Sequence, residues 1–258
     1  MVLTIDIGNT NIVLGEWEGD RLRFVSRVET DISMTEDSYA VRFKNILELY
    51  EVQFEKIEGS IISSVVPQVT GSVAFAVGKL TGKKPLIVGP GIKTGLNIRI
   101  DDPAELGSDL VVDAVAALSK YPKPIIIFDM GTATTVSVID NDSCFIGGAI
   151  MPGLRVGLNA LAEHAALLPQ VGLDAPRDII GRNSADSMKS GAVFGSASMI
   201  DGMAARIEER LGQKATVVAT GGNSKDIVPF CQCGIIYDAN LLLEGLIKLY
   251  RKNTPLKV

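Results

Sequence analysis

A short phrase occurs twice in the chain and is the strongest constraint on its fold. The first copy reads Val-Leu-Thr-Ile-Asp-Ile-Gly-Asn-Thr-Asn over residues 2–11, and the second reads Ile-Ile-Ile-Phe-Asp-Met-Gly-Thr-Ala-Thr-Thr over residues 125–135. Each copy is an apolar run, an Asp-x-Gly tract and a second strand-like run, which predicts a strand–turn–strand hairpin. Duplicated hairpins with an aspartate and a glycine at the turn are typical of a clamp for nucleotide phosphates, and they favour two lobes.

Composition narrows the class of protein further. The chain has 258 residues and a net charge of −5, without a block of either sign. The lack of a Lys/Arg cluster argues against nucleic acid as a partner. No basic leader and no apolar run of about 20 residues occurs, so we expect no membrane segment and a cytoplasmic, soluble protein.

The metal-binding residue types are sparse. Cys144, Cys231 and Cys233 are too few for a disulfide framework, and Cys231-Gln-Cys233 has no second Cys/His pair that would complete a zinc site. His164 is the only histidine, and we expect it to be structural.

Strand and helix patterns alternate in both halves, which predicts an α/β fold. The Tyr-Pro-Lys-Pro stretch at 121–124 divides the chain into expected lobes 1–120 and 121–258. We expect strands at 2–7, 11–17, 22–29, 59–66, 85–88, 125–129, 134–140, 144–150 and 215–219. We expect a helix at 34–50 with Thr35 as its N-cap, and a helix that follows the strand at 59–66 and ends at about residue 80. We expect further helices at 103–119, 154–166, 184–211 and 239–251, with loops at 89–97 and 168–183.

The residues of the first turn suit phosphate and metal binding. Gly8 lets the backbone approach an anion, Asn9 and Thr10 offer polar groups, and Asp6 at a strand end can hold a divalent cation. The alternative is an ordinary polar hairpin turn, which the same residues also favour. Gly221-Gly222 after a strand is open to two interpretations as well, because it could approach a base and ribose or simply turn the chain.

Five motifs in order resemble the type III pantothenate kinase family, within the acetate and sugar kinase/actin/chaperone-ATPase superfamily. They begin at Asp6, Gly107, Asp129, Gly147 and Gly181, and the match runs nearly end to end. The resemblance implies two ribonuclease-H-like lobes related by duplication, with a nucleotide cleft between them, and a homodimer. It also implies ATP-dependent phosphorylation of the primary hydroxyl of pantothenate to 4'-phosphopantothenate, the first step of coenzyme A biosynthesis, with Mg²⁺ and K⁺ or NH₄⁺.

The resemblance also implies a role for each site residue. Asp109 would be the catalytic base, Asp6 would handle Mg²⁺, and Asp129 would bind the monovalent cation. The ATP-binding set would be Asp6, Ile7, Gly8, Asn9, Thr10, Asn11, Ile12, Val13 and Thr132, to which we add Gly221 and Gly222. Pantothenate would contact Ile100, Gly107, Ser108, Asp109, Leu110 and Ser184.

Three residues depart from the family pattern around the acceptor. Leu110 stands where the family has Arg, Ile100 where it has Tyr, and Asp113 where it commonly has Asn. Leucine cannot replace a planar bidentate donor. Asp109 and Asp113 are four apart on one helix face, so their charges should raise one pKa if both are buried. We expect weaker pantothenate binding or a different acceptor.

Asp109 itself is open to another interpretation. A carboxylate in the first turn of a helix is favoured by the helix dipole without any catalytic role. Two alternatives to a pantothenate kinase therefore remain: a non-catalytic or regulatory nucleotide-binding homologue, and a kinase for a different hydroxylated acceptor.

Overall fold

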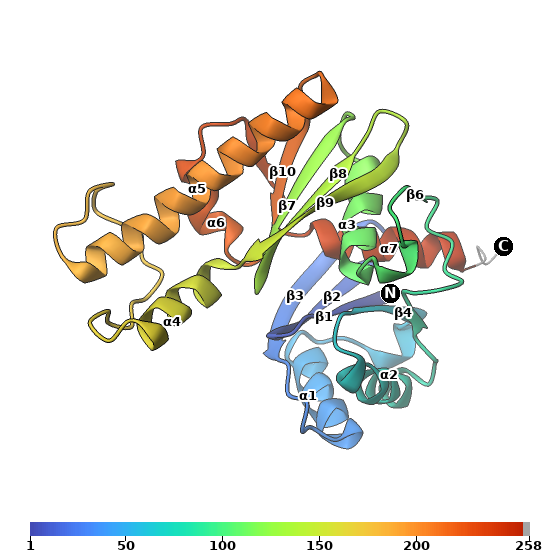
Figure 1. Cartoon of the computed structure of the whole chain (residues 1–258). Coiled ribbons are helices and arrows are strands. Elements are labelled where there is room, and N and C mark those ends of the chain that lie inside the picture. Colours follow the sequence, from blue (N-terminus) through green and yellow to red (C-terminus); the bar gives the residue numbers. More distant parts are fainter. Residues whose placement is uncertain (255–258) are drawn as a thin grey trace. The chain divides into compact units, whose positions relative to one another are not determined.

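The chain forms two compact units, each with its own sheet. The structure is a computed structural model that describes residues 1–254 (Figure 1). The first unit comprises Met1–Gly95, Asp102–Ala116 and the chain from Leu241 onward, and the second comprises Leu96–Asp101 and Ala117–Asn240. In the described range no helix is long and apolar enough to cross a membrane.

The first unit is built on a five-stranded sheet of order β3-β2-β1-β4-β5. β1 is antiparallel to β2, β2 is antiparallel to β3, and β1 and β4 as well as β4 and β5 are parallel. The strands are β1 (Val2–Ile7), β2 (Asn11–Glu18), β3 (Arg21–Glu29), β4 (Gly59–Ser64) and β5 (Leu86–Ile87). The parallel pairing brings the carboxyl ends of β1 and β4 to one edge of the sheet.

The second unit repeats this topology strand for strand. Its order is β11-β10-β7-β8-β9-β6, with β7–β8–β9 antiparallel and β7–β10–β11 parallel. The strands are β6 (Asn97–Ile98), β7 (Ile125–Met130), β8 (Ala133–Ile139), β9 (Cys144–Pro152), β10 (Thr216–Thr220) and β11 (Ile235–Tyr237). The expected α/β class and the expected duplication are therefore confirmed, and β6 is an addition.

Helices bury the two faces of the first sheet. α1 (Glu36–Leu49) and α2 (Pro67–Thr81) place Tyr39, Phe43 and Val73 against Ile5 and Leu14. On the other face α3 (Ser108–Leu118) and α7 (Leu241–Asn253) pack against the sheet through an apolar cluster of Trp17, Ile61, Val112, Leu243 and Leu246. α1 begins at the expected cap, because Thr35 Oγ1 accepts from Ser38 N at 3.3 Å.

In the second unit the long helix α5 covers the sheet. α4 (Leu154–His164) contacts α5 (Ser184–Leu211), and in Figure 1 α4 (yellow) lies below the N-terminal part of α5 (orange). Val193, Ala197 and Ile200 of α5 share a buried cluster with Phe128 and Val136 of the sheet. His164 is exposed at the end of α4.

Several expected elements differ from the structure. The helix expected at 103–119 is a short turn, Pro103–Glu105, capped by the Asp102 carboxylate, followed after Gly107 by α3. β6 and β11 fall in stretches where we expected no strand. Short helical turns at Phe54–Lys56, Ser224–Ile227 and Val228–Phe230 complete the fold.

The C-terminal helix groups with the first unit, whereas the division at residues 120 and 121 placed it in the second lobe. The physical reason is close packing on α3. A side chain at Gly245 would collide with the backbone carbonyl of Val112, so only glycine allows this approach. Similarly, a side chain at Gly59 of β4 would collide with the Tyr250 ring of α7.

Candidate functional site

The first Asp-x-Gly turn is a tight loop that leaves its polar groups exposed. Gly8 N donates to Asn11 O at 3.0 Å, which closes the turn between β1 and β2. Thr30 fixes it from β3's end, since its N–H donates to Thr10 O at 3.0 Å and its hydroxyl donates to Gly8 O at 2.7 Å. Asn9, Thr10 and Asn11 are exposed. A fixed turn with exposed polar groups can bind phosphate oxygens without reorganising.

Two of the residues assigned to ATP have side chains in the core. Ile7 and Ile12 are fully buried between the sheet and helices α1 and α2. Any contact that they make with a nucleotide would be through the backbone.

The start of α3 lies beside the carboxyl end of β1. Asp6 of β1 is paired in register with Ser63 of β4, and the Ser63 hydroxyl lies 3.0 Å from the Ser108 hydroxyl. Asp109 follows Ser108 directly. The first unit therefore brings the phosphate turn, Asp6 and the candidate base to the same region.

The Asp109 carboxylate is a stronger base than that of an ordinary aspartate, because its pKa is raised. Burial raises the pKa of its carboxyl, while hydrogen bonds from the backbone N–H groups of Leu110 and of Asp109 itself oppose the rise. Its Oδ1 accepts from Leu110 N at 2.9 Å. The pKa of a general base is best placed near the working pH, so the upward shift favours proton transfer.

The source of this shift differs from the one expected. We expected the neighbouring Asp113 charge to raise the pKa of Asp109 if both carboxyls were buried. Asp113 is buried, at 1% exposed, but the largest cause of the raised Asp109 pKa is loss of water around its own carboxyl. Gly107 also affects this carboxylate, because a side chain at Gly107 would approach Asp109 Oδ1 to 2.5 Å and would displace it. Gly107 thus leaves room for the carboxylate to fold back over its own helix start.

The second Asp-x-Gly turn has a different environment. Asp129 of β7 lies opposite Thr135 of β8 and beside Thr220 of β10. The Thr135 hydroxyl is buried without a hydrogen-bond partner. Residues directly opposite in an antiparallel pair share a face. Asp129 is therefore next to a buried oxygen whose bonding capacity is unused.

The expected Gly221 turn closes on this site. Gly221 has φ of +90°, and a side chain there would collide with Asp129 Oδ1 and the Met130 backbone. Asn223 ties the turn to the hairpin, because its N–H donates to Met130 O at 3.1 Å and its side chain donates to Gly131 O at 3.2 Å. Glycine at 221 is required both by the backbone angle and by this contact.

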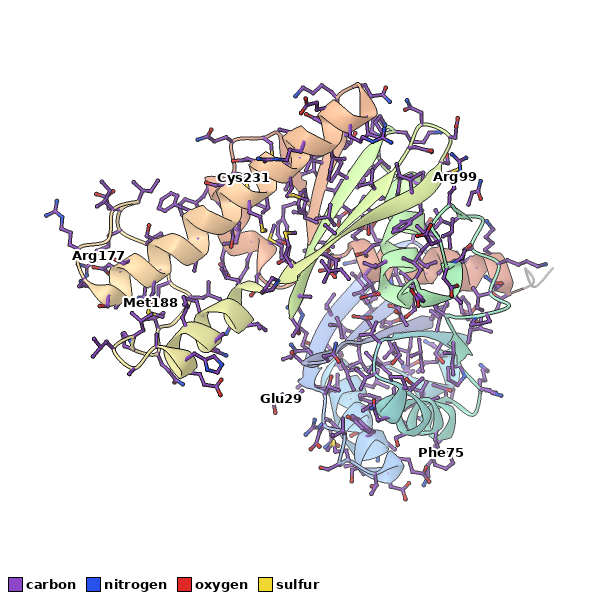
Figure 2. The ribbon with its side chains drawn as sticks, in the orientation of Figure 1. Glu29, Phe75, Arg99, Arg177, Met188 and Cys231 are labelled. Carbon is purple, nitrogen blue, oxygen red and sulfur yellow. The ribbon has the colours of Figure 1, made fainter. Side chains whose placement is uncertain are left out.

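Ser184 lies on a cavity of about 780 Å³ between α4 and α5. Gly153, Leu158 and Met188 also line it, and Figure 2 shows Met188 on the α5 side. Ile100 is half-buried in the segment after β6, in this same unit, whereas Gly107, Ser108 and Leu110 belong to the first unit.

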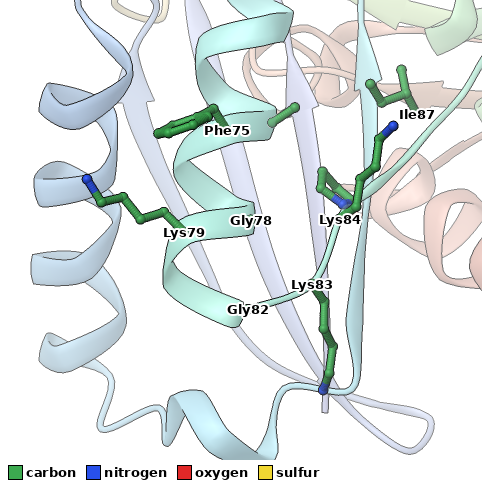
Figure 3. A pocket seen from close by; sticks show the side chains of 9 residues that line it. Phe75, Gly78, Lys79, Gly82, Lys83, Lys84 and Ile87 are labelled. Carbon is green, nitrogen blue, oxygen red and sulfur yellow. The ribbon is translucent and has the colours of Figure 1, made fainter.

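A second cavity, of about 580 Å³, holds none of the expected site residues. It lies between the end of α2 and β5, where Phe75 and Ile87 are lining residues (Figure 3). Lys79 points away from it toward α1 and pairs with Asp37 at 2.7 Å. Lys83 and Lys84 also line this cavity, and Lys83 Nζ donates to Ile57 O.

Among residues 1–254, no group of three His, Cys, Asp or Glu side chains is placed to hold a metal ion. The thiols of the Cys-x-Cys stretch are free, and burial, with the nearby Asp201 carboxylate, raises the pKa of Cys231 to about 11 and that of Cys233 to about 12. Protonated thiols are poor metal ligands.

Four polar residues of these sites escaped the sequence analysis: Ser63, Ser64, Thr135 and Asn223. The serines follow an apolar run at the end of β4, which is the position where site residues gather in parallel sheets. That signal was available in the sequence. Asn223 and Thr135 belong to the motifs themselves, but their contacts depend on strand register.

A family model and two curated relatives name the same family. A model of the type III pantothenate kinase family matches residues 2–206. Type III pantothenate kinases from Brevibacillus brevis and an Exiguobacterium species are 43% and 42% identical to this chain over 253 residues. Each alignment covers 98% of this chain and 99% of the relative. A solved putative 2-dehydro-3-deoxygalactonokinase from Sinorhizobium meliloti superposes with a TM-score of 0.59 at 12% identity, covering 100% of this chain and 98% of that one. This last likeness shows the fold alone.

Proposed function

The chain belongs to the type III pantothenate kinase family, and on this premise we propose how its residues divide the phosphorylation of pantothenate. The enzyme uses ATP to phosphorylate the primary hydroxyl of pantothenate, in coenzyme A biosynthesis. The observation that carries the assignment of roles is the half-buried Asp109 carboxylate at the start of α3, in the same unit as the Asp6 turn.

The Asp6 turn is the proposed phosphate-binding element. Exposed backbone and side-chain groups of Asn9, Thr10 and Asn11 would bind ATP phosphate oxygens, together with Thr132, Gly221 and Gly222 of the second unit. A single carboxylate at Asp6 fits Mg²⁺, which is commonly bound by one or two carboxylates, water and substrate phosphates. Bound there, Mg²⁺ would neutralise charge on the phosphates.

Asp109 is the proposed general base. The pantothenate hydroxyl oxygen attacks the γ-phosphorus, the bond to the ADP oxygen breaks, and Asp109 accepts the hydroxyl proton. Positioning carries much of the catalysis in phosphoryl transfer, so Asp109 would both orient the hydroxyl and accept its proton. The raised pKa of Asp109 supports the second task.

We expect Asp109→Asn to lower pantothenate-dependent kcat about 100- to 10,000-fold while MgATP still binds. Because the pKa is raised in the folded enzyme, the active carboxylate is lost as pH falls through a value above the ordinary aspartate range. Wild-type kcat/KM should therefore drop on the acid side at that value, and Asp109→Asn should lack this limb. A coupled ADP-release assay across pH checks both, with exposed Glu55→Gln as control. An active Asp109→Asn enzyme would exclude the base role.

Asp129 is the proposed site of the monovalent cation. K⁺ prefers several oxygen ligands, and the Asp129 carboxylate lies opposite the unpartnered Thr135 hydroxyl, close to the Gly221 backbone. These oxygens fit such an ion. Bound there, the cation would supply fixed positive charge near the turn that holds Thr132.

We expect pantothenate-dependent turnover to rise when K⁺ replaces Na⁺. Asp129→Asn should remove this activation, and Thr135→Val should weaken apparent K⁺ affinity about tenfold, because one charge-linked ligand is lost. Binding of Tl⁺ followed by thallium NMR gives a readout that does not depend on activity. Ser137→Ala, further along β8, is the control. Unchanged Tl⁺ binding in Asp129→Asn would place the cation elsewhere.

The proposed pantothenate contacts are Gly107, Ser108, Asp109 and Leu110 of the first unit, with Ile100 and Ser184 of the second. Ser184 lines the α4–α5 cavity, which supports its assignment. We propose that Leu110 weakens pantothenate binding or changes the preferred acceptor, because the family's usual arginine would supply a bidentate donor there.

Leu110→Arg should lower the pantothenate KM about tenfold, the value of one charge-assisted hydrogen bond. Leu110→Lys is the matched control and should gain much less, since a lysine lacks the planar donor pair. Initial rates at saturating ATP measure the difference. A wild-type KM already equal to that of relatives with arginine would refute the proposal.

We propose that the enzyme is a homodimer joined through the α4–α5 region. Large apolar side chains are exposed in the segments that flank these helices, with Ile150 of β9 76%, and Leu167 and Ile180 of the α4–α5 loop 91% and 73% exposed. Exposed apolar side chains that gather on one surface are typical of a protein interface. Its position beside the cavity that contains Ser184 would link assembly to acceptor binding.

Light scattering should therefore give the mass of two chains. Ile179→Glu together with Ile180→Glu should yield a monomer, because a carboxylate at a buried interface is costly. Ile32→Glu is the matched control, as Ile32 is also 73% exposed but lies in the first unit. A wild-type monomer, or a dimer that survives the double substitution, would contradict this interface.

We place the enzyme in the cytoplasm, where cysteines stay reduced. Its three cysteines are free thiols, which supports this location.

The non-catalytic alternative would bind nucleotide with no turnover in the presence of pantothenate and K⁺.

A further inference from the structure

The Ser108 hydroxyl makes three hydrogen bonds to the end of β4. It donates to Ser64 O at 3.0 Å, accepts from Ser64 N at 3.1 Å, and lies 3.0 Å from the Ser63 hydroxyl. A serine hydroxyl has one proton and two lone pairs. With the proton on Ser64 O, the other two contacts use the lone pairs, so this side chain is fully bonded within the protein.

These bonds replace a missing strand. Ile62 O accepts from Val88 N at 2.8 Å, so the polar groups of alternate β4 residues point toward β5. The β4–β5 ladder ends at the pair Ile62 and Ile87, which leaves the N–H and C=O of Ser64 beyond the ladder. Ser108 bonds both of these groups with one hydroxyl. The start of α3 is thereby attached at a defined place on the sheet.

The attachment of α3 to β4 lies next to the Asp6 turn, the loop of residues 8–11 between β1 and β2. Ser63 is paired in register with Asp6, and Ser64 is paired with Ile7, which directly precedes the turn closed by Gly8 N and Asn11 O. Ser108 contacts both serines and is followed directly by Asp109. The path from Asp6 to Asp109 thus runs through one strand pairing and one hydroxyl–hydroxyl contact.

A second set of bonds holds the end of β4 itself. The Ser64 hydroxyl accepts from Thr70 Oγ1 at 2.7 Å and from Val66 N at 3.1 Å. This links the strand end to the first turns of α2. The Ser64 backbone that Ser108 bonds is therefore held on the α2 side as well.

We infer that Ser108 is a positioning residue, whose hydroxyl attaches α3 to β4 and so sets the place of the Asp109 carboxylate relative to the Asp6 turn. The inference rests on the base role proposed for Asp109. It also changes the role of Ser108 from a side-chain ligand of pantothenate to a group that reaches the acceptor only through its backbone. Displacement of a reacting group by about 1 Å can cost about 100-fold in rate, which makes this attachment consequential.

The test compares three substitutions within this hydrogen-bond network. Ser108→Ala removes all three bonds and should lower pantothenate-dependent kcat about 10- to 100-fold. Ser63→Ala removes one bond and leaves the two to the Ser64 backbone, so its kcat should lie between that of wild type and that of Ser108→Ala. Thr70→Val removes a bond to the Ser64 side chain but none to Ser108, and should stay within about twofold of wild type, since the attachment remains.

Two further readouts separate positioning from damage to the fold. Calorimetric titration of Ser108→Ala with MgATP should give wild-type affinity and one site per chain. Ser108→Thr keeps the hydroxyl and should recover most of the lost rate. Wild-type turnover in Ser108→Ala, loss of ATP sites in parallel with activity, or failure of threonine to recover any rate would each overturn the inference. If Asp109→Asn is active, the base role is wrong instead, whatever Ser108→Ala does.

Discussion

The parallel pairing of β1 with β4 is the constraint on which the first unit's site depends. Parallel strands end at the same edge, so Asp6 and Ser63 lie side by side although 56 residues separate them in sequence order. The register is held by the buried faces of both strands, because a slip of one residue would turn Ile5 and Ile62 away from the core. Core packing on one face therefore places the polar residues at the strand ends.

Burial acts on the site as well as on the core. Close packing of α7 on α3, through Gly245 and Val112, keeps α3 against the sheet. Burial raises the pKa of the Asp109 carboxyl at the start of α3, while hydrogen bonds from the backbone N–H groups of Leu110 and of Asp109 itself lower it. A pKa raised from the ordinary aspartate value would suit the base role proposed for Asp109.

Sequence reasoning reached the hairpins because their signals are local. Alternation, the Asp-x-Gly tract and the turn residues all lie within about ten residues, and both hairpins and the cap at Thr35 are confirmed. β6 and β11 were missed because strands of two or three residues exist only through distant partners. The helix start at Ser108 was misplaced because Pro103 begins a separate turn that Asp102 caps.

The same distinction holds for the site. Asp6, Asp109 and Asp129 could be named from motifs, since each lies in a recognisable tract. Ser63 and Ser64 could not be given a role, because their contacts to Ser108 span 45 and 44 residues and depend on the strand register. The two copies of the opening phrase differ for a similar reason. Asp6 is beside a serine already bonded to α3, whereas Asp129 is beside an unpartnered threonine and under the backbone of Gly221. A site of fixed protein oxygens suits a cation that stays with the protein, while an exposed turn suits one that arrives with phosphate. On the proposed assignment, one duplicated topology would hold two different ions.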